Sequence, residues 1–76
     1  MVLSLGANIK RFRLERGLTQ EEVANHLGIS FQSISKWERG ESYPDIELLP
    51  VLSNYFGVNV DELLGVSEPS KKEKYD

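Results

Sequence analysis

The sequence contains no cysteine and only one histidine among its 76 residues. A disulfide framework or a cysteine-based zinc site therefore cannot hold the fold together, and one histidine cannot make a histidine-rich metal site. No apolar run approaches the roughly 20 residues that a membrane span requires. Residues 1–13 also lack the apolar stretch that follows early basic residues in a secretory signal. We expect no metal, no cofactor and no membrane partner.

The composition indicates one small globular domain. Hydrophobic residues make up 39% of the chain and charged residues 28%, a balance typical of folded rather than disordered proteins. The chain has no phosphate-binding glycine loop and no paired carboxylates placed for acid–base work. A domain of this size also rarely encloses a substrate pocket. We therefore do not expect an enzyme.

Charge is spread unevenly along the chain. Residues 1–39 carry six basic and four acidic side chains, whereas residues 40–67 carry five acidic side chains and no basic one. The overall net charge of -3 thus conceals a weakly basic first half, which fits a molecule with one phosphate-facing side. An ordinary solvated surface would give the same counts, so charge alone does not decide.

Apolar residues recur at helical spacing throughout, and no segment alternates as a strand does. Thr19 and Glu22 form a capping box, and Ser30 and Asp45 are expected to cap later helices. Pro50 lies five positions after Asp45, so we expect a kink or a lost hydrogen bond there. The predicted helices cover residues 5–16, 20–27, 31–39, 46–55 and 60–64. We expect an ordered domain over residues 1–65 and a disordered tail or linker over residues 66–76.

The second and third predicted helices fit a helix-turn-helix unit. In the twenty residues that start at Gln20, the fifth should be small and is Ala24, and the ninth should tolerate a positive φ and is Gly28. The fourth, eighth, tenth, fifteenth and eighteenth should be apolar, and they are Val23, Leu27, Ile29, Ile34 and Trp37. A helical hairpin without a role in DNA binding is the plainer alternative.

Residues 6–64 resemble the phage-repressor helix-turn-helix family, of the Cro/cI or XRE type. The residues that carry the resemblance are Arg13, Gly17, Leu18, Thr19, Gln20, Ser33, Trp37, Glu38, Arg39, Gly40 and Pro44. The resemblance implies an all-α, compact five-helix, lambda-repressor-like domain with the helix-turn-helix at helices two and three. It also implies a prokaryotic, cytoplasmic transcription regulator, in particular a repressor, that binds double-stranded DNA as a homodimer on a two-fold operator.

The family's third helix lies in the major groove, which assigns the base contacts here to Phe31, Gln32, Ser33 and Lys36. Gln32 can pair with adenine and Lys36 can donate to guanine. Phe31 can touch a thymine methyl group, or it is an aromatic that faces solvent or a dimer partner. Ser33 and Ser35 either contact DNA or are simply small surface residues.

The predicted phosphate contacts are Gln20, Ser35, Arg39, Arg11 and Lys10. Gln20 lies at the start of the second helix, where side chain and backbone N–H can grip a phosphate together. For the three cations, a solvated charge is the alternative. In relatives the positions of Arg13 and Glu38 form a buried ion pair, so we expect these two residues to be structural. Trp37 is expected in the core and His26 on the surface.

Two further features leave alternatives open. The apolar residues near the end of the domain either form a dimer contact or close the core; they are Val58, Val60, Leu63, Leu64 and Val66, with Leu5 as a weaker dimer candidate. The acidic segment 40–67 also fits a protein–protein module, such as an antitoxin or an adaptor. The charged stretch after Gly65 reads as a linker, so this chain can equally be a piece of a longer regulator with a further domain or an effector.

Overall fold

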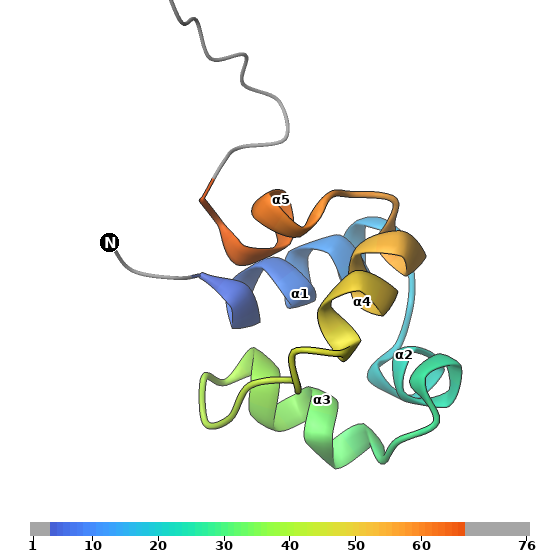
Figure 1. The fold of residues 1–76 in the computed structure, drawn as a ribbon. Coiled ribbons are helices and arrows are strands. Elements are labelled where there is room, and N and C mark those ends of the chain that lie inside the picture. Colours follow the sequence, from blue (N-terminus) through green and yellow to red (C-terminus); the bar gives the residue numbers. More distant parts are fainter. Residues whose placement is uncertain (1–3, 67–76) are drawn as a thin grey trace, which may run out of the picture.

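The computed structural model describes residues 4–66 and contains five helices within them (Figure 1). They are α1 (Leu5–Glu15), α2 (Gln20–Leu27), α3 (Phe31–Glu38), α4 (Leu48–Phe56) and α5 (Val60–Leu64). The predicted all-α, five-helix fold is confirmed. None of these helices is both long and apolar enough to cross a membrane. The predicted tail beyond Val66 lies outside the described residues.

The helix-turn-helix forms as its local residues dictate. The Thr19 hydroxyl accepts from the N–H of Glu22, whose carboxylate accepts from the N–H of Thr19, so the capping box predicted for α2 is present. Gly28 ends α2 with a φ of 72°, a conformation that favours glycine. Ser30 then caps α3 by accepting from the N–H of Gln32 at 3.0 Å. The turn between the two helices is therefore set by capping chemistry.

The start of α4 differs from the prediction. Asp45 does not cap it, because the helix begins at Leu48 with Glu47 as the residue before it and without a side-chain cap. Pro50 is consequently the third residue of the helix. The first four N–H groups of a helix have no intrahelical acceptor, so the missing N–H of Pro50 costs no hydrogen bond. The predicted kink or lost hydrogen bond is therefore wrong.

The core lies between the five helices, each of which contributes at least one buried apolar residue. It contains the buried apolar residues Leu5, Ile9, Phe12, Val23, Ala24, Ile34, Trp37, Leu52, Phe56 and Leu63. Trp37 is thus in the core, as predicted. α5 rests on α1, where the amide of Asn8 donates to the carbonyls of Glu62 and Leu63. Figure 1 shows α5 above α1, with α2 and α3 at the opposite end of the molecule.

Most of the apolar run near the end of the domain closes the core. Leu63 is fully buried, and Val58 and Leu64 pack against the core as partly buried residues. Leu5 is only 4% exposed, so the weaker dimer candidate is an interior residue. Val66 remains 42% exposed. The apolar surface that this run leaves for a dimer contact is therefore smaller than the sequence pattern indicates.

Candidate nucleic-acid interface

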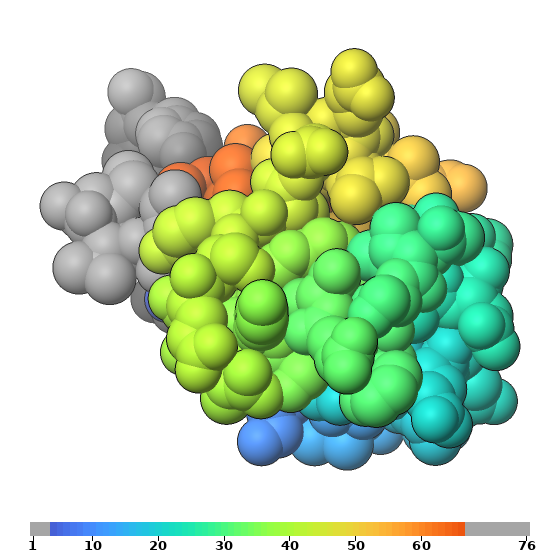
Figure 2. All heavy atoms as spheres, turned by 90° about the horizontal axis from the view of Figure 1, so that it is seen from below, coloured from blue at the N-terminus to red at the C-terminus, as the bar shows by residue number. Residues whose placement is uncertain are grey.

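The outer face of α3 gathers most of the residues predicted to meet bases. Ile34 and Trp37 turn inward, which leaves the opposite side of this eight-residue helix outward. A shallow hollow of about 390 Å³ follows this side and is lined by Phe31, Gln32, Ser35, Lys36 and Arg39. Ser33 is half-buried and does not line it. Figure 2 looks onto this face, with α3 in green at its centre and α2 in cyan beside it.

The side chains on this face remain available for contacts. Phe31 is 46% exposed although it is a large apolar residue. The hydroxyl of Ser30 donates to Oε1 of Gln32 at 3.1 Å, which leaves the amide N–H₂ of Gln32 without an acceptor among residues 4–66. Lys36 is exposed and has no ion-pair partner within hydrogen-bonding distance in the same range. The face thus offers one amide donor, one ammonium group and one apolar ring.

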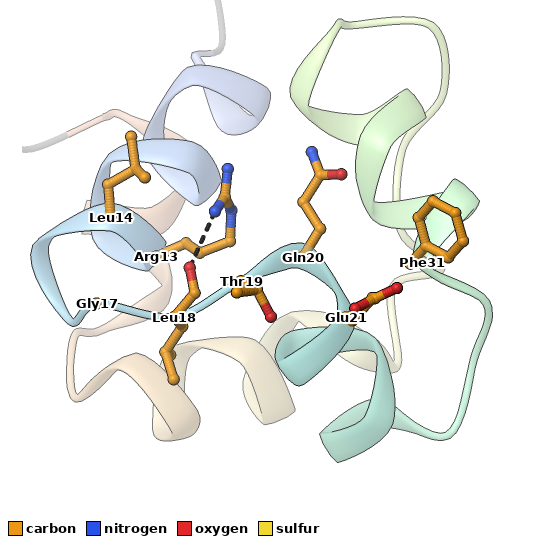
Figure 3. Close-up of a pocket in the computed structure, with 8 residues that line it drawn as sticks. All are labelled: Arg13, Leu14, Gly17, Leu18, Thr19, Gln20, Glu21 and Phe31. Atoms are coloured by element: carbon orange, nitrogen blue, oxygen red, sulfur yellow. Dashed lines mark hydrogen bonds between the residues drawn. The ribbon is translucent and has the colours of Figure 1, made fainter.

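The start of α2 forms a second part of the interface. The capping box satisfies the N–H groups of Thr19 and Glu22 and leaves those of Gln20 and Glu21 pointing off the helix. They border a hollow of about 590 Å³, shown in Figure 3, between the α1–α2 turn and Phe31 of α3. Backbone N–H groups at a helix start favour an anion. The carboxylate of Glu21 borders the same hollow and opposes one.

The side chain of Gln20 is already engaged. Its Nε2 donates to Oε1 of Glu38 at 3.0 Å, so the side chain bridges α2 to α3. Any phosphate contact in this geometry would use the backbone N–H of Gln20 while the amide stays on Glu38. The sequence pattern had placed the side chain on DNA and did not indicate this bridge.

Arg13 and Glu38 form the ion pair that the resemblance implied. Nε of Arg13 lies 2.7 Å from Oε2 of Glu38, and Nη2 lies 3.0 Å from Oε1. Nη1 donates to the carbonyl of Leu18 at 2.9 Å, the bond drawn in Figure 3. The two side chains are only 10% and 5% exposed. The hydrogen bonds to Glu38 raise the pKa of Arg13, so the guanidinium stays charged, and the pair ties α1 to α3.

The predicted phosphate-binding cations differ in their surroundings. Lys10 and Arg11 are exposed on α1, and the Arg11 guanidinium lies 4.8 Å from the centre of the Phe12 ring. Neither residue lines the hollow along α3, and Figure 2 shows α1 only at the border of the α3 face. Arg39 lies beside α3 but is bound by Glu41.

The sequence pattern missed several residues that position this interface. Arg16 donates to the carbonyl of Phe56 at 2.7 Å and to that of Phe12 at 3.0 Å, which fastens α1 to the end of α4. His26 is on the surface, as predicted, but its ring stacks on Tyr55 at 3.8 Å between centroids.

Within residues 4–66, no three side chains of histidine, cysteine or acidic type gather where they could hold a metal ion.

Relatives with solved structures share this arrangement. The P22 c2 repressor in complex with a synthetic operator superposes with a TM-score of 0.77 at 32% identity, over 83% of this chain and 96% of that one. The biofilm regulator SinR in complex with DNA gives a TM-score of 0.71 at 33% identity, over 79% and 97% of the two chains.

Comparison with curated protein sequences also finds helix-turn-helix transcription regulators. The transcriptional regulator ImmR of Bacillus subtilis is 42% identical over 74 residues, which are 97% of this chain and 58% of ImmR. The activator BcrR of Enterococcus faecalis is 39% identical over 87% of this chain and 32% of its own length. The chain thus spans less than two thirds of these relatives. The family model HTH_3, described as helix-turn-helix, matches residues 9–63. The chain therefore belongs to this helix-turn-helix family, whose phage-repressor members its sequence resembles.

Proposed function

We propose that this protein is a sequence-specific DNA-binding transcriptional regulator that acts as a repressor. The observation that carries the proposal is the outward face of α3, where an amide, an ammonium group and an exposed ring line one shallow hollow. An α-helix fits the major groove, and these groups match the base edges displayed there. The structural relatives P22 c2 and SinR were solved with operator and DNA, which supports a DNA-binding role for this chain.

Each residue on α3 has a proposed role. Gln32 reads adenine through its amide, Lys36 donates to guanine, and Phe31 contacts a thymine methyl group. Ser33 is half-buried, and we propose it as a minor contact at most. Ser35, the backbone N–H of Gln20, Lys10, Arg11 and Arg39 supply phosphate contacts. So few contacts per subunit imply weak non-specific binding that salt removes readily.

A homodimer is the proposed assembly, because one α3 reads only a few base pairs. Two copies related by a two-fold axis would read two half-sites about one helical turn apart. Val66, the exposed member of the apolar run near the end of the domain, supplies apolar surface for this contact. The equilibrium mass of the 76-residue chain by analytical ultracentrifugation, alone and with operator DNA, tests this step.

Selection of bound duplexes from a random pool, followed by sequencing, tests the main proposal. We expect enrichment of an inverted repeat whose half-sites lie about 10 base pairs apart, or a multiple of that distance. Binding that stays at the level of the unselected pool would overturn the proposal. A reporter promoter that carries the selected site then tests repression, since an activator would raise its output.

A protein–protein module is the second candidate, and one surface favours it. Tyr43 and Ile46 between α3 and α4 are 65% and 80% exposed, next to the acidic side chains of Asp45 and Glu47. Relatives of this chain include the antitoxin PezA of Streptococcus pneumoniae, 38% identical over 61 residues, and SinR, which was solved in complex with the protein SinI. A nuclease-treated pull-down that recovers one stoichiometric partner, together with no selected DNA, would favour this function.

A further inference from the structure

Arg39, at the end of α3, is held by an acidic residue two positions later. Its Nε donates to Oε2 of Glu41 at 2.8 Å, and its Nη2 donates to Oε1 at 3.1 Å. Nη1 of the same guanidinium donates to the hydroxyl of Ser35. Each nitrogen of the predicted phosphate-binding guanidinium therefore donates one hydrogen bond within the protein, which uses three of its five N–H groups.

Glu41 lies within the basic end of the α3 face. The hydrogen bonds from Arg39 lower the pKa of Glu41, and the positive charge of Lys36 lowers it further. The carboxylate is thus ionised at neutral pH, next to Lys36 of α3 and to Arg39, which follows the helix. It weakens the positive potential where a phosphate would approach.

The pair is built so that a phosphate can replace the carboxylate. A guanidinium binds carboxylates and phosphates with the same two-pronged geometry. Both side chains are 53% exposed, and exposed ion pairs are weak, so exchange between the two anions is easy. Nothing buried has to move for it to happen.

We propose that Glu41 is an internal competitor of the DNA phosphate for Arg39 and thereby sets the affinity and salt dependence of the interface. This proposal rests on the proposed DNA-binding function. Glu41 keeps Arg39 away from the phosphate for part of the time, so in the wild type this phosphate contact is only partly formed. The contact then yields little net cation release, although such release normally drives a phosphate contact.

The substitution Glu41→Gln tests the proposal on the full chain. We measure the affinity for a fluorescein-labelled, mixed-sequence duplex by anisotropy over a fourfold range of salt, because a phosphate contact needs no specific sequence. Without the competitor, the slope of log K against log salt should become steeper by about 0.9 per subunit. Affinity at the low-salt end should rise about threefold, since one contact is worth about that factor over such a range.

Glu47→Gln is the matched control, because Glu47 is an exposed acid in the same segment without a hydrogen-bond partner among residues 4–66. It removes the same charge and should leave the salt slope unchanged. A second control combines Glu41→Gln with Arg39→Ala. If Glu41 acts through Arg39, Glu41→Gln should no longer change the slope in that background.

The outcomes separate the two proposals. If the wild type binds and Glu41→Gln matches it in affinity and slope, the competitor role fails and the DNA-binding function stands. If Glu41→Gln and Glu47→Gln change affinity and salt slope equally, Glu41 acts only through its contribution to the net charge. That result would also overturn the competitor role. If the wild type binds no duplex at any salt concentration, both proposals fall.

Discussion

Gly6 of α1 lies directly against the backbone of Trp37 in α3. A Cβ atom added at Gly6 would come far closer to the carbonyl oxygen of Trp37 than real Cβ atoms approach an oxygen. The obstacle is backbone inside a helix, which cannot rotate away as a side chain can. The absence of a side chain at Gly6 therefore sets how closely α1 and α3 pack, and α3 is the helix proposed to read DNA.

The substitution Gly6→Ala should destabilise the domain by about 2 kcal/mol, because overpacking a close contact costs about 1–3 kcal/mol. Replacement of glycine by alanine normally stabilises a helix by about 1 kcal/mol, so the sign of the change in unfolding free energy shows whether the close contact exists. Urea unfolding followed by circular dichroism measures it. Ala7→Gly, at the exposed neighbouring position, should cost only the usual 1 kcal/mol or so. A stabilised Gly6→Ala protein would contradict the close approach.

Glu38→Gln tests the buried ion pair. The substitution keeps the size of the side chain but leaves the Arg13 guanidinium largely buried without its countercharge, and it also disturbs the bond from Gln20. Breaking a buried pair on one side typically costs about 3–5 kcal/mol, and we expect about 3 kcal/mol in urea unfolding. The double variant Arg13→Met with Glu38→Leu should recover much of that loss. A loss below about 1 kcal/mol for Glu38→Gln would show that the pair is not structural.

The sequence predicted the helix-turn-helix almost to the residue because its signals are local. The box formed by Thr19 and Glu22, the turn at Gly28 and the cap at Ser30 each depend on a few neighbouring residues. The start of α4 was mispredicted for the complementary reason. Asp45 is a good local cap, but the packing of Leu48 and Leu52 into the domain decides where the helix begins.

The contacts of polar groups on the candidate site were less predictable. The residue types on α3 follow from sequence register, so Gln32 and Lys36 could be placed on an outward face. Which partner engages Gln20 depends on the positions of side chains in three dimensions, because Glu38 lies 18 positions away in the sequence. Glu41 alone had a signal in the sequence, since an acid two positions after a helix-terminal arginine can reach back to it.

Pro50→Ala tests the corrected start of α4. At the third position of the helix the proline removes no hydrogen bond, so alanine should change the free energy of unfolding by less than about 1 kcal/mol. A proline in the middle of a helix costs about 3 kcal/mol, and its replacement would stabilise the protein by that amount. Thermal unfolding of the two proteins side by side distinguishes these cases. A gain of about 3 kcal/mol would instead indicate that Pro50 lies in the interior of the helix and would contradict a start of α4 at Leu48.

The pKa of Glu41 should lie below its ordinary value of 4.5 in the free protein, because Arg39 donates two hydrogen bonds to the charged form. A group with a lowered pKa stabilises the folded state above its ordinary pKa, and this contribution is lost as pH falls through the lowered pKa. A carbon-13 NMR titration of the side-chain carboxyl measures the midpoint. In Arg39→Ala the midpoint should rise toward 4.5. An unchanged midpoint would show that the pair does not persist in solution.

Substitutions at base contacts and at phosphate contacts should change DNA binding in different ways. Gln32→Ala should cost about 1–3 kcal/mol on the selected operator and little on a mixed-sequence duplex, because it removes a contact to one base. Lys36→Ala should lower both affinities but also narrow the gap between the two DNAs. Lys10→Ala should weaken both equally and reduce the salt slope by about 1, as the loss of a phosphate contact does. All three side chains are exposed, so circular dichroism should stay that of the wild type. Equal losses on both DNAs for Gln32→Ala would remove it from base reading, and unfolding would refute its place on the outward face of α3.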